Sequence, residues 1–346
     1  MEKFFRLISF SVPSPVLSPL GKSALKVPDL PPRLLLDLQG GYCNLKCPKC
    51  FVHGEENSPE TMKILRGRMP LEEAQKILDE VITAKPMIQP NLWTEPLLAK
   101  NFQEHLRQMK ERGMAVSLNT NGLLLDEKMG AFFVEIKLDS IFISIDAITP
   151  EVLQKTRGTT KLAEIEASVH RMLKVRGDSP LPRVGVSFTT EEANAHQRDD
   201  FVKKWLPCVD VVRVGERYEK TGSTHRAVPL ETRVPCGSLY ETLPVHFNGK
   251  AAICCLDGYQ QTDMGNVFER GVRGVWHGTE FTQVRKLHEE GRYDEVPFCK
   301  DCNVWASYLY KEETIYEEGV VIRRSPLITY YNRTDRLKNY RGGKGF

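Results

Sequence analysis

The sequence predicts an α/β fold in which helices cover a parallel β-sheet, followed by a smaller cysteine-rich region. Two observations predict this arrangement. Short apolar runs alternate with longer amphipathic segments between residues 33 and 215, and five of the nine cysteines gather between residues 236 and 302. Strands that alternate with helices pair in parallel through right-handed crossovers. The residues alone leave open whether the sheet is doubly wound or a partial barrel.

Six runs have the length and the β-rich apolar composition of buried strands; they span residues 34–38, 87–93, 115–118, 140–145, 184–188 and 209–214. The segments between them, such as 71–82, 102–109 and 165–175, carry apolar residues at helical spacing. Asp126, and Thr149 followed by Pro150, are typical of helix starts. Ligands of such sheets bind at the carboxyl ends of the strands, so we expect the site there.

We divide the chain into four regions. Residues 1–32 form an irregular, proline-rich segment, 33–225 the strand–helix region, 226–310 the cysteine-rich domain and 311–346 a C-terminal extension. The polar stretch 220–235 is typical of a linker. Asn248-Gly249 predicts a hairpin turn between strand-like pieces at 243–247 and 251–254. The end of the chain is basic and glycine-rich, and we expect it to be solvated rather than to bind RNA or phosphate.

Composition places the chain among ordinary globular proteins, because 41% of its 346 residues are hydrophobic, 27% are charged and the net charge is +3. So small a charge makes a nucleic-acid partner unlikely, and no apolar run approaches the roughly 20 residues that cross a bilayer. Arg6 and three prolines interrupt the N-terminal apolar stretch, which argues against a signal peptide. We therefore expect a cytoplasmic protein without a membrane partner.

The cysteines fall into two tight groups, which is typical of metal binding rather than of a disulfide framework. Cys43, Cys47 and Cys50 stand on one loop directly after the first expected strand. Three thiolates can hold three irons of a 4Fe–4S cluster and leave the fourth iron open to another ligand. The alternative is a structural zinc site with His53 as fourth ligand, although CxxxCxxC at a strand end is unusual for zinc.

The loop CNLKCPKC at 43–50 resembles the signature loop of the radical S-adenosylmethionine (SAM) superfamily. Further motifs agree at the expected strand ends: WTEP at 93–96, NTNG at 119–122, SID at 144–146 and RG at 157–158. The resemblance covers about residues 33–305. It implies a partial (β/α)6 TIM-type barrel whose cluster binds SAM through its open iron.

The resemblance also implies which residues contact SAM: Thr94, Glu95, Asn119, Ser144, Asp146 and Arg157. In relatives, the counterpart of Thr94-Glu95 receives the amino group, the serine and aspartate lie near the ribose, and the arginine lies near the carboxylate. Two residues depart from the pattern. Lys49 stands where the family has an apolar residue near adenine, so we expect Phe51 to take over part of that contact, and Thr94 replaces a glycine.

The second cysteine group consists of Cys236, Cys254, Cys299 and Cys302. Four thiolates across a hairpin and a distant CxxC suit one 4Fe–4S cluster or one zinc ion, and their spacing leaves both open. With the first loop upstream, the segment resembles the SPASM/twitch extension, which carries auxiliary clusters. No cysteine follows Cys302, so a single auxiliary cluster of the twitch type is implied. The pattern resembles the butirosin-pathway aminocyclitol dehydrogenase, which oxidises a secondary alcohol.

Three other residues have two interpretations each. Cys255 adjoins a ligand and can donate a hydrogen atom to a substrate radical or substitute as a ligand. Asp257 can serve as a base, although a turn-capping role is the simpler interpretation. Cys208, beside a predicted strand, is expected to be a small buried hydrophobe.

Together these features predict an enzyme that uses two 4Fe–4S clusters and SAM to abstract a hydrogen atom, with a flavodoxin- or ferredoxin-type electron donor. We expect oxidation of a sugar, cyclitol or other small molecule. Epimerisation with Cys255 as hydrogen donor and modification of a peptide or protein remain alternatives. Only 42 residues precede Cys43, which we consider too few for a leader-binding domain, so a small molecule is favoured over a peptide. The non-enzymatic alternative is an iron–sulfur or zinc scaffold.

Overall fold

The computed structural model describes residues 26–48, 50–54, 65–217, 233–308, 313–325 and 327–339. Most of the expected segment 1–32, most of the linker 220–235, Lys49 and residues 340–346 lie outside these ranges. Within them, ten strands form one sheet in the order β10-β11-β12-β8-β7-β6-β5-β4-β1-β9. A separate two-stranded sheet pairs β2 (Gln39–Gly40) with β3 (Gly67–Arg68).

The centre of the large sheet consists of the six expected strands, all paired in parallel. They are β1 (Arg33–Leu36), β4 (Met87–Gln89), β5 (Ala115–Thr120), β6 (Ser140–Ser144), β7 (Arg183–Thr190) and β8 (Val211–Glu216). Their spatial order follows their order in the chain, whereas a doubly wound sheet reverses at a switch point. Because β1 and β8 pair with other strands and not with each other, the barrel is partial, as expected.

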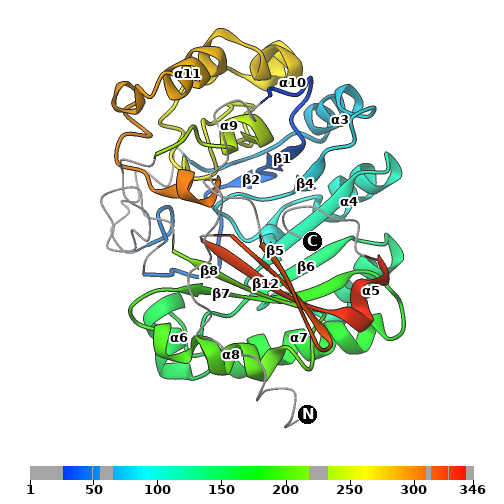
Figure 1. The fold of residues 1–346 in the computed structure, drawn as a ribbon. Coiled ribbons are helices and arrows are strands. Elements are labelled where there is room, and N and C mark those ends of the chain that lie inside the picture. Colours follow the sequence, from blue (N-terminus) through cyan, green and yellow to red (C-terminus); the bar gives the residue numbers. More distant parts are fainter. Residues whose placement is uncertain are drawn as a thin grey trace.

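Helices between these strands cover the outer side of the sheet (Figure 1). They are α3 (Leu71–Glu80), α4 (Phe102–Glu111), α5 (Glu127–Glu135), α6 (Pro150–Arg157), α7 (Leu162–Arg176) and α8 (Arg198–Trp205). Both expected helix starts are confirmed. The Asp126 side chain accepts a hydrogen bond from the Met129 amide at 2.8 Å, and that of Thr149 accepts one from Val152 at 3.4 Å.

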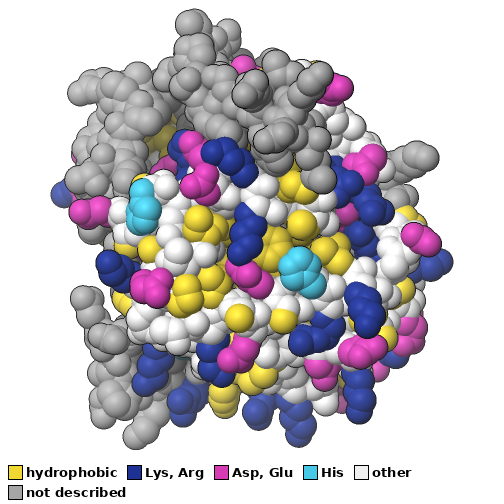
Figure 2. All heavy atoms as spheres, turned by 90° about the horizontal axis from the view of Figure 1, so that it is seen from below, with side chains coloured by type: hydrophobic (Ala, Val, Ile, Leu, Met, Phe, Trp, Pro, Cys, Tyr) yellow, Lys and Arg dark blue, Asp and Glu magenta, His cyan; other side chains and the backbone are white. Residues whose placement is uncertain are grey.

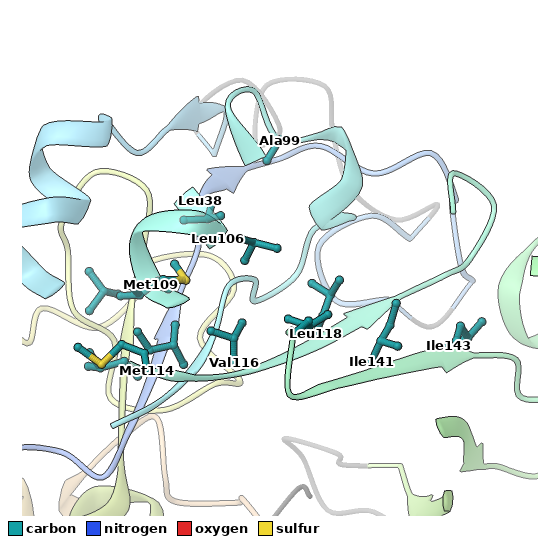
Figure 3. Packing of buried hydrophobic residues seen from close by; sticks show 14 of the residues in the cluster. Leu38, Ala99, Leu106, Met109, Met114, Val116, Leu118, Ile141 and Ile143 are labelled. Atoms are coloured by element: carbon teal, nitrogen blue, oxygen red, sulfur yellow. The ribbon is translucent and has the colours of Figure 1, made fainter. Parts of the chain in front are cut away.

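The two faces of each parallel strand differ in chemistry, and this difference positions the site. Val116, Leu118, Ile141 and Ile143 pack with residues of α4 in the apolar layer between sheet and helices (Figure 3). The alternate positions of the same strands are largely polar; hydrogen bonds there join Ser140 to Ser117, Ser187 to Ser144 and Arg213 to Asn119. The apolar face therefore stabilises the fold, and the polar face is left to line the interior of the barrel.

The sheet extends beyond the predicted strands at both edges. The cysteine-rich region contributes β9 (Thr242–Val245), which pairs in parallel with β1, so the two predicted domains share one sheet. At the other edge, β10 (Glu313–Glu317), β11 (Val320–Arg324) and β12 (Ile328–Arg333) form an antiparallel meander on β8. The predicted C-terminal extension is therefore part of the sheet at least to Arg333.

The remaining helices belong to the cysteine-rich region and to short connections. The α-helices are α9 (Ser238–Glu241), α10 (Val267–Trp276) and α11 (Thr279–Glu289), which lie beyond β1 in Figure 1. The 3-10 helices are η2 (Pro96–Leu98), η3 (Ala195–Gln197), η5 (Tyr293–Glu295), η6 (Val304–Tyr308) and η7 (Thr334–Asn339). The predicted turn at Asn248-Gly249 is confirmed, because Gly249 has φ +83° and its amide donates to the His246 carbonyl oxygen at 2.9 Å.

Two properties of the structure are relevant to binding partners and membranes. The face seen from below carries basic and acidic side chains side by side (Figure 2). Ion pairs there include Lys203–Asp200 within α8 and Lys204–Glu166 between α8 and α7. Among the described residues, no helix has the length and apolar character needed to cross a membrane. One expectation about the surface is wrong: Cys208 is exposed rather than buried, since it lies in the turn after α8 and before β8.

Candidate active site

The first cysteine loop follows β1 and β2 at the carboxyl end of the barrel strands. Its turns are closed by backbone hydrogen bonds from Cys50 to the Cys47 carbonyl (2.9 Å) and from Gly54 to the Cys50 carbonyl (3.0 Å). Backbone amides also point at two of the sulfurs, with the Leu45 amide 3.5 Å from the Cys43 Sγ and the His53 amide 3.3 Å from the Cys50 Sγ. Such amide contacts favour thiolates, the form of cysteine that binds iron.

The electrostatics of this loop favour a cationic occupant. Burial raises the pKa of Cys43 to about 12, and the charges of Glu95, Cys47 and Cys50 add to the effect. Burial also raises the pKa of Cys47, opposed by the nearby Arg157. Thiols with raised pKa values, such as those of Cys43 and Cys47, become thiolates when metal ions supply the opposing charge.

Helix α6 fixes the other side of the loop. It ends at Gly158, which has φ +67°, and a Cβ atom there would lie 2.5 Å from the Lys46 carbonyl oxygen, so only glycine permits this approach. The preceding Arg157 contacts Asp146 Oδ2 through Nε at 2.7 Å and Nη2 at 2.6 Å. Asp146 Oδ1 accepts from the Thr189 amide at 2.6 Å. The aspartate therefore holds Arg157 in place with both of its oxygens engaged.

Glu95 is a structural anchor in this structure. Its carboxylate accepts hydrogen bonds from the Thr120 hydroxyl (2.7 Å), the Asn121 amide (2.8 Å) and the Leu97 amide (3.2 Å), and it is buried. Burial raises the pKa of Glu95, while these hydrogen bonds oppose the shift. Beside it, the Thr94 hydroxyl donates to Asp37 at 3.1 Å. The carboxylate thus ties the segment at 94–96 to the end of β5.

A cavity of about 410 Å³ opens beside the first loop. Of the residues predicted to contact SAM, Asp146 and Arg157 line it, together with Cys47, Cys50 and Phe51. Thr94, Glu95, Asn119 and Ser144 do not line it. Ser144 accepts a hydrogen bond from Ser187, and Asn119 from Arg213; both donors line the cavity. The motif search missed Ser187, Thr189 and Arg213, because β7 and β8 carry no motif that distinguishes their inward residues.

The second cysteine group lines another cavity, of about 240 Å³. Its wall includes all four predicted ligands and one additional cysteine: Cys236, Cys254, Cys255, Cys299 and Cys302. Burial raises the pKa of Cys236 and Cys254 strongly, with neighbouring thiols adding to the effect. The four predicted ligands therefore share one cavity wall, as the ligands of a common cluster or ion would.

The two candidate catalytic residues of this region have different surroundings. Cys255 is half-buried in the wall of the second cavity, where desolvation raises its pKa and the charge of Arg33 opposes the shift. Asp257 lines neither cavity. Its carboxylate accepts from the Gln261 and Thr262 amides, both at 2.8 Å, and from the Thr262 hydroxyl at 2.6 Å. This is the turn-capping role that the sequence left open for Asp257.

The two cavities adjoin, because Arg213 and Ile328 line both of them. Arg213 lies on β8, with its guanidinium 4.4 Å from the ring centroid of Phe142 and Nη2 2.8 Å from Asn119 Oδ1. Ile328 begins β12, the strand that the sequence did not predict. A substrate at this junction would have the first cysteine loop on one side and the second cysteine group on the other.

Comparison with known proteins gives the family. Residues 39–195 match the family model of the radical SAM superfamily, and residues 236–303 match that of SPASM, an iron–sulfur cluster-binding domain. The chain joins a radical SAM domain to a SPASM domain. The radical SAM domain binds a 4Fe–4S cluster and SAM, and the SPASM domain binds a further iron–sulfur cluster. The expected superfamily and cofactors are thereby confirmed.

The names of the similar curated proteins describe different activities. A tungsten-containing aldehyde ferredoxin oxidoreductase cofactor-modifying protein of Pyrococcus furiosus is 22% identical over 311 residues, which are 76% of this chain and 85% of the relative. An S-adenosyl-L-methionine-dependent 2-deoxy-scyllo-inosamine dehydrogenase of Niallia circulans is 36% identical over only 55 residues, 16% of this chain and 22% of the relative.

Solved structures show the same fold at low sequence identity. BtrN in complex with AdoMet and 2-DOIA matches 82% of this chain and 96% of its own, with a TM-score of 0.53 and 17% identity. The AdoMet-bound anSMEcpe matches 81% of this chain and 91% of its own, with a TM-score of 0.57 and 15% sequence identity. The likeness supports the partial barrel followed by the auxiliary domain.

Proposed function

We propose that this radical SAM protein is a dehydrogenase that oxidises an alcohol or amine carbon of a small molecule, with a sugar or cyclitol as the favoured class. The observation that carries the proposal is the shared wall of the two cavities at Arg213 and Ile328. A substrate bound at this shared wall would lie between the SAM site and a second group of four cysteines. The dehydrogenase of Niallia circulans, similar over a short segment, acts by its name on such a cyclitol amine.

We assign the cofactor ligands as follows. Cys43, Cys47 and Cys50 hold the cluster that binds SAM, and Arg157, held by Asp146, receives the SAM carboxylate. Cys236, Cys254, Cys299 and Cys302 hold the auxiliary cluster. Glu95 shapes the amino-group site indirectly, by fixing the backbone of the segment that follows Trp93.

When bound, the cluster and SAM supply a 5′-deoxyadenosyl radical, which takes one hydrogen atom from the substrate carbon and leaves a carbon-centred radical. The protein then has to direct the loss of one electron and one proton. The four cysteines would supply one thiolate to every iron of an auxiliary cluster, which would leave it no open position for substrate and suit it to accept the electron. A carboxylate of the first cavity wall, Glu191 or Glu216, can accept the proton while Arg213 at the junction stabilises the oxygen. Phe51 and Trp93, which line the first cavity, exclude water from the radical.

The competing enzymatic functions predict different products. An epimerase would return a hydrogen atom from a thiol such as Cys255, which lies in the second cavity wall. We would test the proposal in heavy water with 2-deoxy-scyllo-inosamine first, followed by other cyclitols and sugars. Oxidation predicts a product lighter by two hydrogens, without deuterium on carbon. A product of unchanged composition carrying one solvent deuterium, absent with Cys255→Ala, would instead indicate epimerisation; turnover of peptides alone would indicate a peptide-modifying enzyme.

A further inference from the structure

The charges around the second cavity are unbalanced. Arg33, Arg213 and Arg233 line it, and no Asp or Glu is among the described residues of its wall. Within the described part of the chain, none of the three arginines forms an ion pair with a carboxylate, whereas Arg157 in the first cavity is paired with Asp146. The cavity that holds the second cysteine group therefore carries three formal positive charges from its wall.

Two of these arginines are held by neutral partners away from the cysteine segments. Arg33 on β1 donates through Nη2 to Gln89 Oε1 at 3.0 Å. Arg213 on β8 donates to Asn119 Oδ1 at 2.8 Å and lies over the Phe142 ring. Neutral partners position a guanidinium without cancelling its charge, so the field of both groups extends into the cavity.

The third arginine contacts a cysteine segment directly. Arg233 donates to the carbonyl oxygens of Cys299 (2.6 Å) and Lys300 (2.9 Å), and its guanidinium lies 4.3 Å from the Tyr293 ring centroid. This arginine therefore combines two functions, because it holds the turn between Cys299 and Cys302 and places a charge beside it.

A cluster on four thiolates is an anion that becomes more negative when it accepts an electron. Positive charge in a buried wall stabilises the reduced form more than the oxidised form, and net charge is one of the factors that set the potential of such clusters. We propose that Arg33, Arg213 and Arg233 raise the reduction potential of the auxiliary cluster and thereby make it an electron acceptor. This inference rests on the proposed function, since it requires a cluster on the second cysteine group.

The test is a redox titration of the reconstituted holoenzyme followed by electron paramagnetic resonance. The signal that changes on addition of SAM belongs to the first cluster, and the other is the auxiliary signal. Arg33→Gln and Arg213→Gln should each lower the auxiliary midpoint. At the wild-type midpoint, the ratio of reduced to oxidised cluster should fall about tenfold, equivalent to about 59 mV for one electron.

Two control variants separate the effect of charge in the cavity wall from other effects of replacing an arginine. Arg213→Lys keeps the charge and should keep the midpoint. Arg292→Gln removes an exposed arginine of the same domain, whose charge water and salt screen, and should also leave it unchanged. Arg233→Gln also removes two hydrogen bonds to the cysteine turn, so the test depends on Arg33 and Arg213. Midpoints of Arg33→Gln and Arg213→Gln equal to that of Arg292→Gln would overturn the proposal.

Iron content separates this inference from the proposed function. About eight irons with equal midpoints in all variants would overturn only the role of the arginines. About four irons in the wild-type protein, with no auxiliary signal, would overturn the assignment of the second cluster and this inference with it.

Discussion

The indole Nε1 of Trp93 donates a hydrogen bond of 2.8 Å to the carbonyl oxygen of Cys255. Trp93 also contacts the first cysteine loop, because its carbonyl oxygen lies 2.7 Å from His53 Nε2 and its ring packs edge-on against Phe51, with centroids 5.3 Å apart. One side chain thus joins the SAM-binding loop to the auxiliary cysteine segment. The two cluster sites are held as one unit rather than as separate domains.

Trp93→Phe should loosen both cysteine segments. Phenylalanine keeps the ring contact but removes the donor, so we expect a loss of about 1 kcal/mol of stability and faster release of iron to a chelator. Trp205→Phe is the matched control, because the buried Trp205 indole nitrogen has no hydrogen-bond partner among the described residues. Equal rates of iron release from the two variants would show that the bond to Cys255 does not stabilise the sites.

Cysteine variants should separate the two clusters. The wild-type protein is expected to bind about eight irons, in two 4Fe–4S clusters. Changing Cys43, Cys47 and Cys50 together to alanine should leave about four irons and abolish SAM cleavage. Cys208→Ala, at an exposed cysteine, should keep all eight. Stoichiometric zinc with little iron after anaerobic preparation would contradict both assignments.

Arg157→Gln should weaken SAM binding without loss of iron. The variant removes a charge-assisted hydrogen bond to the SAM carboxylate, which is worth on the order of 1.5–3 kcal/mol, or roughly ten- to 150-fold in Kd. Anaerobic equilibrium dialysis with labelled SAM measures this Kd. Arg171 is exposed, and Arg171→Gln serves as the control. Unchanged affinity would show that Arg157 does not contact SAM.

Glu95→Ala, in contrast, should weaken SAM binding and also lower the stability of the protein, because three hydrogen bonds are lost.

Asp37 should make stability depend on pH. Burial raises the pKa of this carboxyl from 3.8 to about 7, opposed by the Thr94 hydrogen bond. The folded state therefore binds the proton more tightly than the unfolded state, so the stabilisation is complete below about pH 4 and is lost as the pH rises through 7. Asp37→Asn should gain stability relative to wild type between pH 5 and 8, by up to roughly 4 kcal/mol at 1.36 kcal/mol per pKa unit.

Thermal unfolding across this pH range measures the difference. Asp178→Asn, at an exposed aspartate, is the control and should follow the wild-type protein. If Asp37→Asn and the wild-type protein change in parallel with pH, the Asp37 carboxyl is ionised throughout and its predicted contribution is wrong.

The sequence predicted the parts of the fold that depend on local pattern. The six central strands follow apolar periodicity, and the helix starts at Asp126 and Thr149 follow capping chemistry. The strands β10, β11 and β12 and the strand partner of β9 were missed for physical reasons. The strand-like piece at 243–247 was predicted, but its hairpin signal suggested local pairing. Locally it forms one isolated bridge, from Val245 to Ala251, and its strand partner is β1, more than 200 residues earlier. Residues 313–333 mix polar and apolar side chains without a regular alternation, and their strands depend on pairing with the exposed edge of β8.

The candidate site was predictable where motifs specify it. Cys47, Cys50, Asp146 and Arg157 line the first cavity, and the four cysteines of the second group line the other, whereas Cys43 lines neither. The motif did not reveal that Glu95 uses its carboxylate within the protein, because only the fold brings Thr120 and Asn121 to it. Arg213 was missed because one arginine in a strand has no signal of its own until the topology places it between two cavities.

We propose that SAM is cleaved at the first cysteine group and that the second group acts on the resulting substrate radical. The most direct test is to measure 5′-deoxyadenosine formed from SAM under dithionite, with anaerobically reconstituted protein. The wild-type protein and the Cys299→Ala/Cys302→Ala variant should both form it, whereas the Cys43, Cys47 and Cys50 triple variant should form none. Formation of 5′-deoxyadenosine by that triple variant, or its absence with the fully loaded wild-type protein, would contradict the account.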